Sequence, residues 1–204
     1  LQGIERYETV WLVWSHGEQI DPGGLARQWL IERYPILTEQ WPRGVEVRAF
    51  AVRYRQPAPA DAAVLAIFGG RLRLLAAQAD ATVAARDEVY HPPSGWVHVR
   101  LAWQRVGEAD LTGLHVRVRV TDSIGQVWGE RLERPTEVWR FYPPQRWQPG
   151  EMVRDAYDVY MNPLTPRGRY RVDIQVLDSE GKALPVQADG MPADRYFVAE
   201  VETR

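Results

Sequence analysis

Residues 147–170 read WQPGEMVRDAYDVYMNPLTPRGRY, and this stretch decides the fold. Its first four residues, 147–150, end in proline and glycine and predict a tight turn. Apolar and polar side chains then alternate over 151–160, which predicts a strand with two different faces. Proline and glycine return within 163–168 and predict a second turn, into a strand that starts near Tyr170. Strands joined by such turns are typical of an antiparallel β-domain.

The same alternation recurs on both sides of this stretch, across residues 61–204. We predict strands at residues 72–76, 97–103, 114–120, 127–128, 151–160, 170–176 and 196–201. Short strands at this spacing favour a two-sheet antiparallel sandwich, and we predict an immunoglobulin-like arrangement. A jelly roll is the rival arrangement. The proline- and alanine-rich segment 56–61 reads as a linker ahead of this sandwich domain.

Residues 1–60 follow a different pattern. The apolar run 9–14 predicts a strand that is buried on both faces. A helix capped by Asp21 and stopped by Pro35 comes next, and the alternating segment 45–54 predicts a second strand. This order predicts a small β-α-β segment of an α/β layer in front of a mainly β chain. One of its two strands is expected to leave an unpaired edge, where a copy of the chain could pair in a crystal.

The composition excludes several classes of site. The 204 residues are 45% hydrophobic, which is enough to bury a core. Cysteine is absent, so disulfides, thiolate metal sites and cysteine nucleophiles are excluded. A net charge of -2 gives no overall attraction to nucleic acid, and we predict no such partner. The chain opens with Leu1 and contains no apolar run of about 18 residues, so we expect a soluble piece of a longer protein.

Several blocks of the sequence carry a family resemblance. They are W-x-P-G-E-x-V-x-D-x-Y at 147–157, P-x-G-x-Y-x-V at 166–172, DSEGKAL at 178–184, RYETVWLVW at 6–14 and DPGGLARQWL at 21–30. Together they resemble the C-terminal region of bacterial membrane glycosyltransferases related to glycosyltransferase family 39, the dolichyl-phosphate-mannose-protein mannosyltransferase-like enzymes.

The resemblance implies a position and a role for the chain. It implies an extracytoplasmic domain, tethered to the bacterial membrane by upstream transmembrane helices of the same polypeptide. Such a domain would bind or position an acceptor, a glycan or a lipid-linked sugar, or brace the membrane-embedded part. The catalytic acidic residues of the family lie on a loop near the start of its membrane region, so no catalytic residue carries over to this chain. A free-standing carbohydrate-binding module is the alternative, and a hydrolase is a further one.

Four arginines are candidates for binding an anionic group. Strand alternation places Arg117 and Arg119 on one side of their strand, and places Arg169 and Arg171 on one side of theirs. Neighbouring strands would join them into one arginine face, suited to lipid headgroups, a sugar phosphate or an acidic segment. The competing interpretation is a solvated face of cross-strand ion pairs, with Asp173 as one of the acids.

Aromatic residues are the second set of candidates, because flat rings can stack on sugars. The proline-rich segment before residue 150 offers Trp139, Phe141, Tyr142 and Trp147. The competing interpretation is that these rings pack, with Trp147 holding its turn. Four other tryptophans occupy core-like positions and are expected to pack: Trp11, Trp14, Trp29 and Trp103.

No motif indicates a metal, a cofactor or a catalytic group. The four histidines lack metal-binding spacing; they are His16, His91, His98 and His115. Asp155 and Asp158 stand three apart on a predicted strand, so they face opposite sides and cannot act as a pair.

Overall fold

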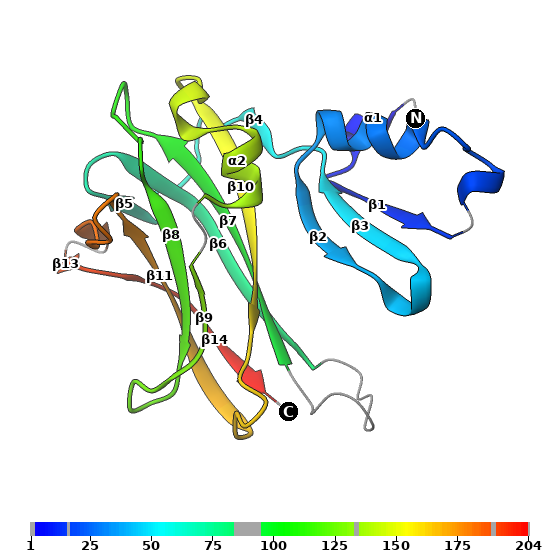
Figure 1. The fold of residues 1–204 in the computed structure, drawn as a ribbon. Helices are drawn as coiled ribbons and strands as arrows, with labels where there is room; N and C mark the ends of the chain where they lie inside the picture. Colours follow the sequence, from blue (N-terminus) through cyan, green and yellow to red (C-terminus); the bar gives the residue numbers. More distant parts are fainter. Residues whose placement is uncertain (1–2, 16, 84–94, 133–134, 189–190, 204) are drawn as a thin grey trace.

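The computed structural model describes residues 3–15, 17–83, 95–132, 135–188 and 191–203. It contains a two-sheet antiparallel β-sandwich with a small three-stranded sheet and its helix beside it (Figure 1). The predicted mainly β sandwich is therefore confirmed.

The larger sandwich sheet has seven strands. Their order is β13 (Met191–Ala193), β12 (Val186–Ala188), β5 (Ala66–Phe68), β6 (Leu72–Val83), β7 (Gly95–Arg105), β10 (Glu151–Tyr160) and β4 (Arg55–Pro57). The second sheet has four strands, in the order β14 (Tyr196–Thr203), β11 (Gly168–Leu177), β8 (His115–Thr121) and β9 (Val127–Leu132). Each strand predicted after residue 61 is present, whereas the short strands β5, β12 and β13 were not predicted.

The long strands follow an immunoglobulin-like order. The first, second and fifth of them, β6, β7 and β10, are neighbours in one sheet, and the sixth strand β11 lies between β8 and β14 in the other. The turn before β11 adds a second sign of this fold. The Tyr170 hydroxyl donates a 2.6 Å hydrogen bond to the carbonyl of Pro166, four residues upstream, as in the tyrosine corner of immunoglobulin-like domains.

The core between the two sheets is built from the inward residues of each alternating strand. Val97, Val99 and Trp103 on β7 are fully buried, and so are Val116 and Val118 on β8. Each fully buried side chain of this kind contributes about 1.5–3 kcal/mol relative to an exposed one. The alternation read from the sequence thus correctly separates the inner face of each strand from its outer face.

The N-terminal unit has its own small core. Its strands β1 (Thr9–Trp14), β3 (Glu46–Ala51) and β2 (Ile36–Gln40) form an antiparallel sheet in that order, with helix α1 (Leu25–Arg33) against it. The buried core residues are Ile4, Leu30, Phe50 and Val52. The predicted strand–helix–strand order is present, but β2 adds a third strand and all neighbours are antiparallel. Short 3₁₀ turns complete the chain at Ile4–Arg6, Gly17–Gln19, Pro42–Gly44 and Pro144–Arg146.

Strand β1 corrects one expectation. It lies at an edge of its sheet and only one of its faces is covered, because Trp11 and Val13 are 58% and 65% exposed. The predictions that this strand is buried on both faces and that Trp11 packs in a core are therefore wrong. Strand β3 lies at the centre of the sheet, so of the two predicted strands β1 is the one with an edge available to a second copy. Such pairing stays a prediction.

Helix α1 begins later than the sequence suggested. Gly24 is the N-cap, with a left-handed φ of 61°, and the helix starts at Leu25. Asp21 still satisfies the free backbone N–H groups of the first turn, because its two carboxylate oxygens accept from Leu25 and Ala26 at 2.9 Å each. Asp21 is thus a capping residue, displaced from the usual position.

The two units meet where a linker was expected. Residues Arg55–Pro57 form β4 and pair with β10, so the segment adjoining the N-terminal unit already belongs to the sandwich. The backbone N–H of Arg154 also donates to the Tyr54 carbonyl at 2.6 Å. These backbone hydrogen bonds attach the end of the N-terminal unit to the edge of β10 that faces away from β7. The N-terminal unit lies beside β10 in Figure 1.

Candidate functional site

The outer face of β6, β7 and β10 carries side chains in register. Cross-strand pairing aligns them in four rows, which we call the cleft face: Ala76–Ala102–Arg154, Gln78–Arg100–Ala156, Asp80–His98–Asp158 and Trp96–Tyr160. Successive rows are about 7 Å apart, because outward residues alternate along a strand at about 3.4 Å per residue. Alanines, arginines and Gln78 fill the first two rows, whereas charged, polar and aromatic residues fill the last two.

A β-bulge shapes the first row. The register of β6 against β7 shifts between Leu74 and Ala76, so Leu75 is the extra residue. The shift brings Ala76 opposite Ala102 on the outer face. Side chains this small leave the sheet surface hollow at this point.

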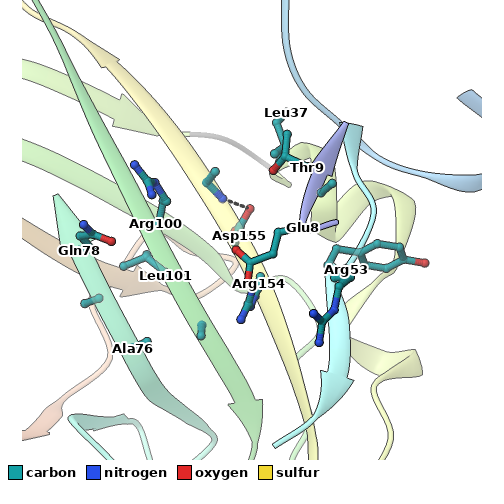
Figure 2. A pocket seen from close by; sticks show the side chains of 15 residues that line it. Glu8, Thr9, Leu37, Arg53, Ala76, Gln78, Arg100, Leu101, Arg154 and Asp155 are labelled. Carbon is teal, nitrogen blue, oxygen red and sulfur yellow. Dashed lines mark hydrogen bonds and ion pairs between the residues drawn. The ribbon is translucent and has the colours of Figure 1, made fainter. Parts of the chain in front are cut away.

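The first cleft lies between this hollow and the N-terminal unit, and it has a volume of about 490 Å³ (Figure 2). Its floor includes Ala76, Ala102 and Ala156, and its opposite wall includes Leu37 and Ala51. Its charged and polar lining residues are Glu8, Arg53, Gln78, Arg100, Arg154 and Asp155. The cleft is therefore an apolar hollow bordered by three guanidinium groups and two carboxylates.

An ion pair crosses the first cleft. Glu8, just ahead of β1, pairs with Arg154 on β10, and Figure 2 shows the two side chains pointing toward each other. The hydrogen bond from Arg154 lowers the pKa of Glu8, and attraction to Arg154, Arg53 and Arg100 adds to this, while partial desolvation opposes it. The Arg154 hydrogen bond is the largest of these contributions, so the carboxylate of Glu8 is held mainly by this one partner.

The other two arginines have weak partners. Arg100 pairs with Asp80 at 3.1 Å, and both side chains are about half exposed or more. Arg53 donates to the neutral Gln56 at 3.0 Å. Exposed pairs of this kind contribute roughly 0–1 kcal/mol. An anion entering the cleft could thus replace these partners at little cost.

The second cleft adjoins the first and has a volume of about 780 Å³. It is lined by β2, by Trp96, His98 and Asp158 of the cleft face, and by Arg131 and Glu137. His98 Nδ1 lies 2.6 Å from Asp158 Oδ1, and Arg131 donates to the Asp158 carbonyl at 2.9 Å. The rings of Trp96 and Tyr160 meet edge to face, with centroids 5.1 Å apart. This cleft combines an aromatic surface with directional polar groups.

The predicted arginine face exists as a surface. Strands β8 and β11 are neighbours, and the outer side of this sheet holds Arg117, Arg119, Arg169 and Arg171. Acidic residues accompany them: Arg119 pairs with Glu130, Arg171 pairs with Asp173 at 2.9 Å, and Glu202 and Glu200 stand opposite Arg169 and Arg171. Arg117 donates to Gln175 at 3.4 Å. This balanced pattern is that of an ion-pair face, on which Asp173 and Gln175 are buried rather than solvated.

The aromatic candidates before β10 are buried. Trp139, Tyr142 and Trp147 are 1%, 4% and 1% exposed. The segment folds into the short helix α2 (Glu137–Phe141), capped by Thr136, which brings Trp139 into contact with Trp103 and Trp147 at centroid distances of 6.3 and 5.5 Å. The Trp147 indole N–H donates to the Tyr142 carbonyl at 3.1 Å. These rings pack between the sheets and present no face to solvent.

The histidines form no metal centre in the described part of the chain. Among those residues there is no group of three or more His, Asp or Glu side chains that could hold a metal ion. His98 lines the second cleft and His115 is buried, whereas His16 and His91 lie outside the described residues. Asp155 is buried and Asp158 lies in the second cleft, on opposite faces of β10 as predicted.

Comparison with known proteins assigns no family. No family model matches the chain, and no curated protein matches it. A crystal structure of a Bordetella pertussis protein provisionally named ApaA aligns with 61% of this chain and 89% of its own length, at 18% identity and a TM-score of 0.26. Among the described residues, no helix has the length and apolar character needed to cross a bilayer.

The sequence contained a usable signal for the cleft face. Alternation along the predicted strand 97–103 places Val97 and Val99 on one side, so Trp96, His98 and Arg100 lie on the other side. What the sequence could not supply was the N-terminal unit that covers them.

Proposed function

We propose that this chain is a non-catalytic accessory module of a membrane glycosyltransferase, on the extracytoplasmic side, and that it binds a lipid-linked sugar in the first cleft. The observation that carries the proposal is the combination of Arg53, Arg100 and Arg154 around an alanine floor. The order of the sequence blocks that resemble the C-terminal region of family 39-related glycosyltransferases supports the setting.

The chemistry of the cleft fits a phosphate on an apolar chain. Guanidinium groups bind phosphate through charge-assisted, bidentate hydrogen bonds. The alanine floor and Leu37 offer apolar surface to the hydrocarbon beside it. A prenyl phosphate has both parts, whereas a neutral glycan would leave the arginines without a ligand group.

Calorimetric titration with geranyl phosphate, with geraniol as the uncharged comparison, tests the binding. The double variant Arg53→Ala/Arg100→Ala should bind geranyl phosphate at least tenfold more weakly, because each charged hydrogen bond contributes about 1.5–3 kcal/mol. Arg169→Ala is the matched control, since it removes an arginine from the opposite sheet. Equal losses in both variants, or no binding by the native chain, would overturn the proposal.

The membrane setting has its own test, in the coding sequence upstream of Leu1. Several apolar segments of about 20 residues each would support a tethered module. A secretory signal peptide directly before Leu1 would overturn the tether and favour a free-standing carbohydrate-binding module.

A further inference from the structure

We infer that the second cleft is a subsite for a neutral pyranose ring, and that the bound glycan carries its anionic group one or more sugars away, in the first cleft. The subsite stands on the residues of the second cleft alone. The statement that one ligand reaches both clefts rests on the proposed function.

The aromatic row supplies a stacking surface. Trp96 is partly exposed at the cleft wall, in contrast to the buried tryptophans between the sheets. Tyr160, which is 44% exposed, contacts the Trp96 ring from outside the cleft lining. The edge-to-face contact, with an interplanar angle of 67°, holds the Trp96 ring in one orientation. The negative face of an aromatic ring attracts the slightly positive C–H groups on the flat side of a sugar. A fixed ring of this kind lowers the entropy lost on binding.

Polar groups surround this aromatic surface in positions suited to hydroxyls. His98 and Asp158 lie one row from Trp96 on the cleft face and are joined at 2.6 Å. Thr38 and Gln40 line the opposite wall, from β2. Donors and acceptors on two sides of an aromatic ring match the alternating hydroxyl groups of a pyranose.

The charge balance of the cleft favours a neutral ligand. Glu39 is paired with Arg48 at 2.6 Å, and Glu137 is paired with Arg140 at 2.8 Å. The positive charge of Arg131 lies beside Asp158, to whose carbonyl it donates. Each of the three lining carboxylates therefore has a basic neighbour, and two of these neighbours, Arg48 and Arg140, lie outside the cleft lining.

The spacing of the rows sets the size of the ligand. Arg100 and Trp96 lie on the same side of β7, four residues apart, which corresponds to about 14 Å. A single sugar ring is shorter than this distance. A ring stacked on Trp96 is therefore not the sugar attached directly to an anion at Arg100, and the ligand class is a short oligosaccharide with an anionic end.

NMR titration tests the subsite, with D-glucose, D-galactose and D-mannose as separate probes. At least one hexose should shift the Trp96 indole N–H signal, assigned by its loss in Trp96→Phe, with a saturable response. Trp96→Ala should abolish hexose binding, whereas Trp41→Ala should leave it unchanged, because Trp41 is an exposed tryptophan outside both clefts. If no hexose shifts Trp96, or if Trp41→Ala loses binding equally, the subsite is rejected.

A second titration separates this inference from the proposed function. Geranyl phosphate is added to the hexose-saturated protein, with signals of β7 residues near Arg100 as the readout. Hexose binding without a phosphate response would overturn the proposed function and the shared ligand, but not the hexose subsite. Both ligands should bind at once, because their groups lie about 14 Å apart. Mutual exclusion would show one common site and overturn the inference.

Discussion

The two outer faces of the sandwich both carry arginines, but they use them differently. On the arginine face, carboxylates of the same sheet accompany the guanidinium groups, as Asp173 accompanies Arg171 and Glu130 accompanies Arg119. On the cleft face, the first two rows hold arginines among alanines, and the N-terminal unit forms the other wall of the cleft beside them. The difference teaches that a cleft and weak pairing, rather than the number of arginines, identify a candidate anion site.

The largest expected effect is a difference in stability: removing a carboxylate should destabilise the protein more on the arginine face than on the cleft face. Asp173 is 6% exposed and accepts two hydrogen bonds from Arg171 Nε, at 2.9 and 3.1 Å. We expect Asp173→Asn to lower the free energy of unfolding by about 1–2 kcal/mol, a value reduced because Arg171 is half exposed. Asp158→Asn in the second cleft should cost less than about 1 kcal/mol, since Asp158 and His98 are both partly exposed. Urea unfolding of both variants checks the order, and a larger loss for Asp158→Asn would contradict the comparison.

A smaller effect, on ligand affinity, is expected from removing the ion pair that crosses the first cleft. Glu8→Gln removes the charge that competes for Arg154 and should raise the affinity for geranyl phosphate by about two- to fivefold. The pKa of Glu8 is lowered in the folded protein, so its contribution to stability is present above the unfolded pKa and is lost as the pH falls through the folded pKa. Acid titration of unfolding should therefore show a smaller loss of stability below about pH 4.5 in the variant than in the native chain.

The smallest effect is expected on the arginine face. The double variant Arg117→Gln/Arg171→Gln should change flotation with anionic liposomes by less than about twofold, because neighbouring acids already offset this surface. The matched variant is Arg53→Gln/Arg100→Gln on the cleft face. A marked loss of flotation in the first variant alone would contradict this comparison. It would show that the arginine face, rather than the cleft face, binds the anionic liposomes.

The sequence predicted the sandwich well because its signals are local. Alternation over a few residues gives the inner and outer face of a strand, and the turn before Tyr170 specifies the step into β11. The N-terminal sheet was harder, because β2 is only five residues long and follows the helix with no turn cluster. Its antiparallel pairing depends on contacts distant in the sequence.

The site was less predictable than the fold, for two reasons. The proline-rich segment before Trp147 looked like an exposed loop, yet α2 turns Trp139 into the core. Conversely, Trp96 and Arg100 looked unremarkable on their strand, because only the placement of the N-terminal unit makes their face a cleft. Strand alternation predicts which face of the sheet a side chain lies on, but it does not predict which residues of another unit cover that face.

Leu37 lines both clefts, so the two share one wall. This residue lies on β2, a strand at the edge of its sheet. A group that displaced β2 in one cleft would change the space in the other, and the free energies of filling the two clefts would then not be additive. A measured coupling between hexose and phosphate binding would report on the stiffness of this wall, and through it on how firmly the N-terminal unit is held against the sandwich.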